Sequence, residues 1–474
     1  MTKILSVASE CAPLVKTGGL ADVVGALPAA LAALGDEMKT LIPGYPSVMS
    51  QAKAAKTVAT LETLFGGHGK ILSAKIEGLD LLILEAPHLF DRPGGPYIDA
   101  NGRDWVDNPE RFAALCFAAA HVAKEGVGSW APDVVHGHDW QAGLVPEYLN
   151  ALGCDAPFLF TVHNIAFHGN VDAARLSTLR LDHARFNPEH FEFWGQISAL
   201  KAGLMGATKI NTVSQTYGEE LKTEAFGMGM EGVLRARSDD LSGIVNGIDT
   251  DVWNPTTDPA IKAYKTPRGK AANKKALQKE FGLKPADGPL CVLVSRLTHQ
   301  KGIDLLIEAL PALLERGGQL ALLGSGDPAL EVALLELAAS EANVGVKVGY
   351  NEELSHKMMA GGDAILVPSR FEPCGLTQLY GLRYGTIPLV ALTGGLADTV
   401  INANPAAMAR DVATGVQFHP ITAHALSNAF ARLCHLYAQP KIWGALQRNA
   451  MKQPVGWETS AQAYHALYAS MAKV

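Results

Sequence analysis

Short apolar runs alternate along the chain with longer segments in which apolar residues recur at helical spacing. Residues 3–9 (KILSVAS) predict a buried strand, and residues 20–35 (LADVVGALPAALAALG) predict a helix that ends at Gly35. Further apolar runs that end in polar residues predict strands at 38–45, 132–140, 157–164 and 208–215. Strands that alternate with helices in this way indicate a parallel sheet with helices on both faces.

Residues 55–100 depart from this pattern, because they contain several short β-type segments separated by glycine turns. We expect an inserted hairpin region there. The stretch 244–270 is rich in Pro, Asp, Asn and Thr, and it predicts a loop or linker.

The alternating pattern begins again near residue 289 and predicts a second α/β domain. Residues 302–317 (GIDLLIEALPALLERG) predict one long helix. Strands are predicted at 289–297, 319–327, 344–350, 364–369 and 386–392. We therefore expect two doubly wound domains with a cleft between them. Ligands bind such sheets beyond the carboxyl ends of the strands.

The end of the chain predicts an amphipathic helix that packs against a core. Its apolar stripe lies at helical spacing and consists of Trp457, Ala461, Tyr464, Tyr468 and Met471.

Composition excludes several classes of protein. The chain has 474 residues, which is too long for one ordinary domain, and 48% of them are hydrophobic. A net charge of −7 without long runs of one sign argues against a nucleic-acid partner. No apolar run is long enough for a membrane span, and the N-terminus lacks the apolar segment of a signal peptide. Six scattered cysteines without a CxxC pair fit reduced thiols in a cytoplasmic protein.

One hexapeptide, TGGLAD, occurs twice, at 17–22 and at 393–398. The first copy follows Lys16 and the second follows Leu392. Gly18 and Gly19 of the first copy could let a ligand approach the backbone at a helix N-terminus, or they could simply form the turn between strand and helix. The loop is neither GxGxxG nor a Walker A sequence, so NAD binding is weakly supported.

The second half offers a cluster of charged residues at predicted strand ends. Arg296 and Lys301 flank a strand-to-helix loop, where two cations could hold a diphosphate leaving group. Glu372 follows another strand, and its carboxylate suits sugar hydroxyls better than phosphate. The backbone N–H groups that lead into the next helix could face phosphate; they belong to Gly375, Leu376 and Thr377.

Polar clusters also follow two strands of the first half, in HGHDW (136–140) and TVHN (161–164). His136, His138 and Asp139 are nearly contiguous and lack the spacing of metal ligands, so we expect no metal site. The DTD sequence at 249–251 falls in the predicted linker and is interpreted as a turn.

Together these segments resemble bacterial glycogen synthase, the ADP-glucose-dependent glycogen and starch synthase family. The resemblance covers the chain from residue 3 to the tail and rests on an ordered set of motifs: KTGGLADVVGALP, HGHDW, TVHN, SRLTHQKGIDLL, GYNEELSHKM, PSRFEPCGLTQLYGLRYG and TGGLADTV.

The resemblance implies an α/β GT-B fold, in which two Rossmann-like, doubly wound domains face each other across a deep cleft. Residues 1–245 would form the N-terminal, acceptor-side domain with the KTGGL loop, and residues 246–455 the C-terminal domain that holds the nucleotide. A C-terminal helix, 456–474, would cross back to the N-terminal domain.

The reaction that the resemblance implies moves glucose from ADP-glucose to the non-reducing 4-hydroxyl of an α-1,4-glucan, either glycogen or a malto-oligosaccharide. The anomeric configuration is retained and ADP is the leaving group. No metal ion, cofactor, nucleic acid or membrane is implied, and the enzyme would be cytoplasmic.

Residue roles follow from the matching motifs. The catalytic group would comprise Asp22 in the KTGGL loop, His163 with its carbonyl near the anomeric carbon, the phosphate-stabilising pair Arg296 and Lys301, and Glu372 beside the donor glucose. Substrate-binding residues would be Lys16, Gly18, Gly19, Asp139, Asn164, Asn246, Tyr350 stacked on adenine, Gly375, Leu376 and Thr377.

Two positions depart from what the resemblance suggests. Many retaining GT-B enzymes carry a second glutamate eight residues after the first, and Tyr380 stands there in this chain. Many relatives carry a basic residue before the second TGGL, where this chain has Leu392.

Two other functions stay open at this point. One is a related transferase with another donor or acceptor, such as UDP-glucose or sucrose-type chemistry. The other is a glucan- or nucleotide-binding protein without catalysis, against which stands the presence of every expected catalytic residue.

Overall fold

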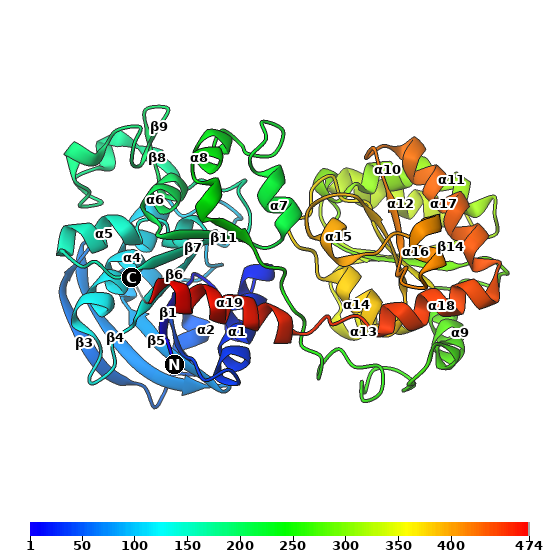
Figure 1. Ribbon diagram of the computed structural model, residues 1–474, viewed down its shortest axis with the longest axis horizontal. Coiled ribbons are helices and arrows are strands. Elements are labelled where there is room, and N and C mark those ends of the chain that lie inside the picture. The colour runs from blue at the N-terminus through cyan, green and yellow to red at the C-terminus, as the bar shows by residue number, and fades with distance from the viewer. Residues whose placement is uncertain (473–474) are drawn as a thin grey trace. The chain divides into compact units, whose positions relative to one another are not determined.

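The computed structural model describes residues 1–472 and divides into two compact units (Figure 1). Unit 1 comprises Met1–Ile244 together with the segment from Trp457 onward, and unit 2 comprises Val245–Gly456. Residues 473–474, the end of the predicted C-terminal helix, lie outside the described residues.

Unit 1 is built on a nine-stranded sheet with the strand order β12-β11-β7-β6-β1-β2-β5-β4-β3. Every neighbouring pair is parallel except β3–β4 and β4–β5. The strands are β1 (Lys3–Val7), β2 (Glu37–Pro43), β3 (Lys56–Leu64), β4 (Gly67–Ile76), β5 (Leu79–Glu85), β6 (Val134–His138), β7 (Phe158–Val162), β11 (Lys209–Thr212) and β12 (Leu241–Gly243). A separate three-stranded sheet contains β8 (Asn170–Asp172), β10 (Gln196–Ser198) and β9 (Glu192–Phe193).

The predicted inserted hairpin region is therefore part of the main sheet. Strands β3 and β4 form the hairpin, but β5 returns as an inner strand parallel to β2. The helices of unit 1 are α1 (Gly19–Ala32), α2 (Pro46–Met49), α3 (Pro87–Phe90), α4 (Asn108–Glu125), α5 (Val145–Leu152), α6 (Ala199–Gly206), α7 (Gln215–Glu220), α8 (Glu231–Ala236) and α19 (Trp457–Met471).

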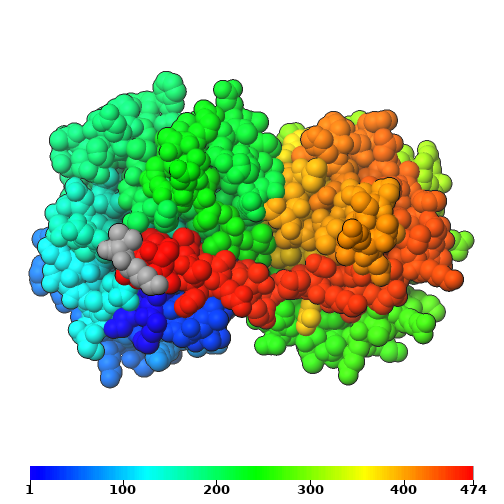
Figure 2. Space-filling view, viewed as in Figure 1, coloured from blue at the N-terminus to red at the C-terminus, as the bar shows by residue number. Residues whose placement is uncertain are grey.

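Helix α19, the predicted amphipathic helix at the end of the chain, packs on unit 1. All five residues of its predicted stripe are buried, and all but Ala461 join a cluster with residues of β1 and α1, so that prediction is confirmed. Buried hydrogen bonds fix the helix: Asn211 Nδ2 donates to the Tyr464 hydroxyl at 3.0 Å, and the Tyr468 hydroxyl lies 2.7 Å from His136 Nδ1. In Figure 2 this red segment lies on the surface beside the blue N-terminal residues of unit 1.

Unit 2 contains a six-stranded parallel sheet with the order β15-β14-β13-β16-β17-β18. Its strands are β13 (Leu290–Val294), β14 (Gln319–Gly324), β15 (Val344–Val348), β16 (Ala364–Val367), β17 (Ile387–Ala391) and β18 (Val416–Phe418). Its helices are α9 (Lys270–Glu280), α10 (Ile303–Ala309), α11 (Pro311–Leu314), α12 (Pro328–Ser340), α13 (Glu352–Gly361), α14 (Thr377–Tyr384), α15 (Gly394–Thr399), α16 (Pro405–Ala409), α17 (Ala423–Tyr437) and α18 (Pro440–Met451).

The prediction of one long helix over 302–317 is wrong. Helix α10 ends at Ala309, and α11 begins at Pro311. Proline has no backbone N–H to donate to the preceding turn and its ring crowds that turn, so the helix is interrupted there.

Each sheet has a switch point, where successive strands of the chain stop being added on one side and begin to be added on the other. In unit 2 the chain passes from β13 to β14 and β15 on one side, and then to β16, β17 and β18 on the other. In unit 1 the corresponding point lies between β1 and β6. The carboxyl ends of strands at such a switch point leave a crevice in which α/β proteins bind ligands.

Candidate active site

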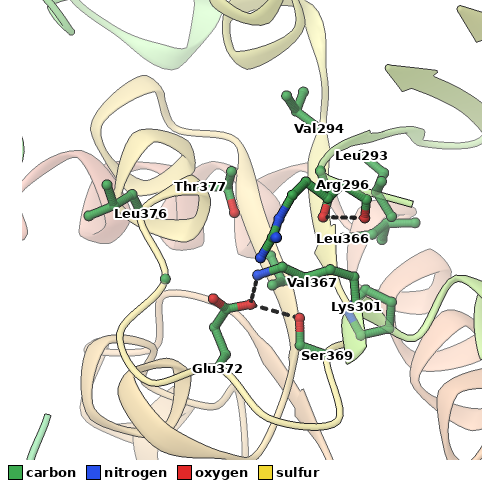
Figure 3. Close-up of a pocket in the computed structure, with 13 residues that line it drawn as sticks. Leu293, Val294, Arg296, Lys301, Leu366, Val367, Ser369, Glu372, Leu376 and Thr377 are labelled. Atoms are coloured by element: carbon green, nitrogen blue, oxygen red, sulfur yellow. Dashed lines mark hydrogen bonds and ion pairs between the residues drawn. The ribbon is translucent and has the colours of Figure 1, made fainter. Parts of the chain in front are cut away.

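A pocket of about 220 Å³ opens at the switch point of unit 2 (Figure 3). Strands β13 and β16, and the loops that leave them, supply its walls. Six predicted site residues meet there: Arg296, Lys301, Glu372, Gly375, Leu376 and Thr377.

The centre of the pocket is a short ion pair. Lys301 Nζ donates to Glu372 Oε2 at 2.6 Å, and Ser369 Oγ donates to the same oxygen at 2.8 Å. Figure 3 shows the Arg296 side chain directed toward this pair. Two cations therefore face one carboxylate, which leaves the pocket with a positive balance suited to an anionic group.

A second ion pair fixes the two loops that carry Lys301 and Glu372. Arg370 donates to both carboxylate oxygens of Asp304, each at 2.7 Å, and also to the His299 carbonyl at 2.6 Å. The backbone N–H of Arg370 donates to the Gln300 carbonyl. The Arg370 guanidinium holds the pKa of Asp304 below its usual value. A bidentate pair of this kind sets orientation as well as distance.

The N-terminus of α14 points its first turn at the same pocket. Its cap residue, Leu376, has no side-chain oxygen to accept from the first N–H groups. Helices α12, α13 and α17 are instead capped by Asp327, Asn351 and Thr422. The open N–H groups and the positive end of the helix dipole favour a phosphate group at α14.

The second TGGLAD copy packs against the loop that carries Glu372. Gly395 donates its backbone N–H to the carbonyls of Glu372 and Pro373, at 3.1 Å each. A Cβ at Gly394 would lie 2.1 Å from the Glu372 carbonyl oxygen, and one at Gly395 would lie 2.1 Å from that of Cys374. The glycines of this copy are required by close backbone packing against the Glu372 loop.

Two predicted binding residues of unit 2 lie outside the residues that line the pocket. Tyr350 follows β15 and is 78% exposed, so the structure does not bring it to the pocket wall. Asn246 is buried, and its Oδ1 has no hydrogen-bond partner among the described residues. An unsatisfied buried carbonyl oxygen is costly unless a ligand or water pairs with it.

In unit 1 the first TGGLAD copy follows β1 and begins α1. Lys16 Nζ lies 2.7 Å from Asp22 Oδ1 across the loop, and both side chains are partly exposed. A Cβ at Gly18 or Gly19 would meet nothing in residues 1–472 within 4 Å beyond its chain neighbours. Gly18 is extended, with φ −153°, so neither packing nor backbone conformation explains these two glycines.

Two residues that the motifs did not reveal, Glu10 and Tyr97, hold this loop in place. The Glu10 carboxylate accepts from the Thr17 hydroxyl at 2.6 Å, from the Thr17 N–H, and from the Tyr97 hydroxyl. Glu10 is buried, and Tyr97 also bonds Ser9 Oγ at 2.7 Å. A carboxylate directly after the apolar run 3–9 was the available sequence signal for Glu10. Nothing local in the sequence pointed to Tyr97.

The loops after β6 and β7 are joined by Asp139. Its Oδ1 accepts from the backbone N–H of His163 at 2.7 Å and of Asn164 at 3.3 Å. Burial raises the pKa of Asp139 to about 7, despite these two bonds. Asp139 also has φ +55°, a conformation that a residue with a side chain rarely adopts and that clusters at functional sites.

The histidines of unit 1 form a buried hydrogen-bonded chain. His163 Nε2 lies 3.0 Å from His138 Nδ1, and His138 Nε2 lies 3.2 Å from Ser6 Oγ. His136 bonds Thr161 Oγ1 and Tyr468. Burial lowers the pKa of His136 and of His163 to about 3, so both rings are neutral near pH 7. Within residues 1–472 no three His, Cys, Asp or Glu side chains are grouped as around a metal ion.

Two family models match the chain. Residues 3–236 match the starch synthase catalytic domain, and residues 274–450 match glycosyl transferases group 1. A glycogen synthase of Jannaschia sp. strain CCS1 is 71% identical over 473 residues, and one of Paracoccus denitrificans is 62% identical over 473 residues. Both alignments cover 100% of each chain. The chain belongs to the glycogen synthase family.

Solved structures agree with this membership. The catalytic domain of starch synthase IV from Arabidopsis thaliana, bound to ADP and acarbose, is 32% identical with a TM-score of 0.86, and 100% of each chain is covered. Sucrose-phosphate synthase from Thermosynechococcus elongatus, at 20% identity and a TM-score of 0.61 over 99% of each chain, shares the fold alone. The expected two-domain GT-B fold of a glycogen synthase is confirmed, and the chain is a glycosyltransferase. Among residues 1–472, every helix is too short or too polar to cross a membrane.

Proposed function

We propose that the chain transfers glucose from ADP-glucose to the non-reducing 4-hydroxyl of an α-1,4-glucan, with retention of the anomeric configuration. Family membership already indicates glucosyl transfer in glycogen synthesis. We propose in addition that the donor is ADP-glucose, that the configuration is retained, and that the residues have the roles given below. The bond from the anomeric carbon to the ADP oxygen breaks, a bond to the acceptor O4 forms, and the acceptor proton leaves with ADP or solvent.

The observation that carries the proposal is the charge pattern of the unit 2 pocket. Arg296, Lys301 and the open N-terminus of α14 provide positive potential where a diphosphate leaving group gains negative charge. Preorganised donors of this kind are worth about 10²–10³ in turnover each. The Glu372 carboxylate would repel phosphate, and it therefore suits the hydroxyls of the donor glucose.

The unit 1 residues are assigned to the sugar side. Lys16, Gly18, Gly19 and Asp22 would contact the donor or the reacting hydroxyl, since the two glycines leave open space that their own fold does not require. Asp139 orients the His163–Asn164 backbone by accepting both N–H groups. That arrangement would direct the His163 carbonyl as the electron-rich group beside an oxocarbenium-like carbon.

Asn246 and Tyr350 complete the proposed donor site in unit 2. The unpartnered Asn246 Oδ1 would accept a sugar hydroxyl, and the exposed Tyr350 ring would stack on adenine. We propose accordingly that unit 2 holds the nucleotide and unit 1 the acceptor.

Variants of the ion pair test this function. Lys301→Ala should lower kcat by about 10²-fold or more, because it removes a cation from the departing diphosphate. Glu372→Ala should lower kcat by about as much, because it removes both the partner that fixes Lys301 and the group assigned to position the donor glucose. Glu372→Gln, which preserves shape and hydrogen bonding without the charge, serves as the matched variant. Transfer to maltotriose and thermal melting are measured on the same preparations. Near-wild-type turnover in both alanine variants, with unchanged Tm, would overturn the assignment.

A further inference from the structure

The hairpin β9–β10 of unit 1 carries an unusual tip. Phe193 pairs with Gln196, so Trp194 and Gly195 form a two-residue turn. Both have positive φ, +52° for Trp194 and +79° for Gly195. Such turns strongly prefer Asn-Gly, because a bulky L residue is strained in this conformation. Burial does not offset the strain at Trp194, since the side chain is 87% exposed.

The turn is nevertheless held firmly. Glu192 Oε1 accepts the Gly195 N–H at 2.6 Å, and Lys201 Nζ donates to the Glu192 carbonyl at 2.6 Å. An exposed indole on a fixed turn loses little conformational freedom when a ligand packs against it.

Neighbouring loops extend the aromatic surface. The Phe193 ring lies edge-on to Trp194, with centroids 6.2 Å apart, and edge-on to His168 at 5.4 Å. A Cβ at Gly229 would lie 2.9 Å from Phe193 Cζ, so the 228–229 loop lies against the same ring. Phe167 precedes His168 in the chain and Met228 precedes Gly229, and both side chains are exposed.

We propose that Trp194 and Phe193 form an aromatic platform that binds the glucan acceptor through the faces of its glucose rings. The inference rests on the proposed function for the identity of the ligand. One face of a pyranose ring presents C–H groups that pack on an indole, while its hydroxyls stay at the rim. Glu192 and Gln196 flank the turn in the chain and carry polar side chains. A stable protein partner needs about 20–30 residues a side, far more than this platform provides.

We assign to the platform glucose units beyond those of a trisaccharide, so its effect depends on acceptor length. Trp194→Asn removes the indole and inserts the residue that the turn prefers, so its Tm should equal or exceed that of the wild type. Its KM for glycogen should rise about tenfold, with kcat, the donor KM and the maltotriose KM unchanged. Trp194→Phe should restore part of the glycogen affinity.

Val106→Ala is the matched control, because Val106 is also in unit 1 and is 81% exposed. A glycogen KM in Trp194→Asn equal to that of Val106→Ala would overturn the platform. So would a change in sedimentation coefficient with unchanged glycogen affinity, which would show that the patch joins two copies of the chain.

Native electrophoresis through glycogen-containing gels separates this inference from the proposed function. If glycogen retards the wild type but not Trp194→Asn, the platform is supported, whether or not glucose transfer is detected. Absence of transfer with every donor would contradict the proposed function. Normal transfer with equal retardation of the two proteins would contradict the platform alone.

Discussion

Glycine-to-alanine substitution in the two copies of TGGLAD should lower activity in both but stability in only one. At Gly395 a Cβ would stand 2.1 Å from the Cys374 carbonyl oxygen, whereas such contacts below 3.0 Å are essentially never observed. The loop that carries Glu372 must therefore move by about 1 Å, a displacement that can cost about 10²-fold in turnover. Overpacking of this kind destabilises by about 1–3 kcal/mol.

At Gly18 the same methyl group enters open space on extended backbone. Gly18→Ala should leave the free energy of unfolding within about 0.5 kcal/mol of the wild type. Turnover should fall at least about tenfold, because the methyl group occupies space assigned to the ligand.

Thermal melting and initial rates of glucose transfer to maltotriose, measured on both variants, distinguish the two effects. Gly395→Ala should lower the Tm by roughly 3–9 °C and also lower kcat. Gly18→Ala should lower activity at unchanged Tm. The reasoning is refuted if Gly395→Ala melts and turns over like the wild type, or if Gly18→Ala keeps full activity.

Two further predictions concern groups that act through their neighbours. Arg370→Ala breaks the bidentate pair with Asp304 and should reduce kcat about tenfold with little effect on Tm, since both side chains are partly exposed. Arg370→Lys should recover part of the lost kcat. Equal rates in the wild type, Arg370→Ala and Arg370→Lys would exclude a positioning role. The pKa of His136, lowered to about 3 by burial, lies below the 6.5 of an exposed histidine, so the unfolded chain binds more protons between these values. The His136 contribution to stability is complete above pH 6.5 and is lost as the pH falls, by about 2 kcal/mol at pH 5. Because the raised pKa of Asp139 acts in the opposite direction, the measurement compares wild type with His136→Gln in urea at pH 7.5 and pH 5. A pH dependence that is identical in the two proteins would contradict the effect.

Much of the fold is predictable from the sequence because parallel strands are buried on both faces and appear as apolar runs. The runs at 3–9 and 364–369 illustrate this, since each contains a strand. Pairing partners are less visible, because register and direction depend on residues far apart in the chain. The pattern of 55–100 therefore predicted a hairpin but not the return of β5 beside β2.

The candidate site was only partly visible for the same reason. Polar residues in the loops that follow buried strands, such as Lys301 and Glu372, could be recognised by position, and the structure brings their side chains within 2.6 Å. The support that Tyr97 gives to Glu10 joins residues 87 positions apart, which no local pattern reveals. The two TGGLAD copies have identical letters, and packing distinguishes the open Gly19 from the enclosed Gly395 at the equivalent position.

The central claim is glucose transfer from ADP-glucose to a glucan, and one measurement tests it directly. Purified protein is offered a malto-oligosaccharide acceptor with either ADP-glucose or UDP-glucose, and acceptor length and free nucleoside diphosphate are quantified. The account predicts acceptor growth by whole glucose units, with ADP released and ADP-glucose strongly preferred. Growth that is faster with UDP-glucose, or no growth with either donor, would contradict it.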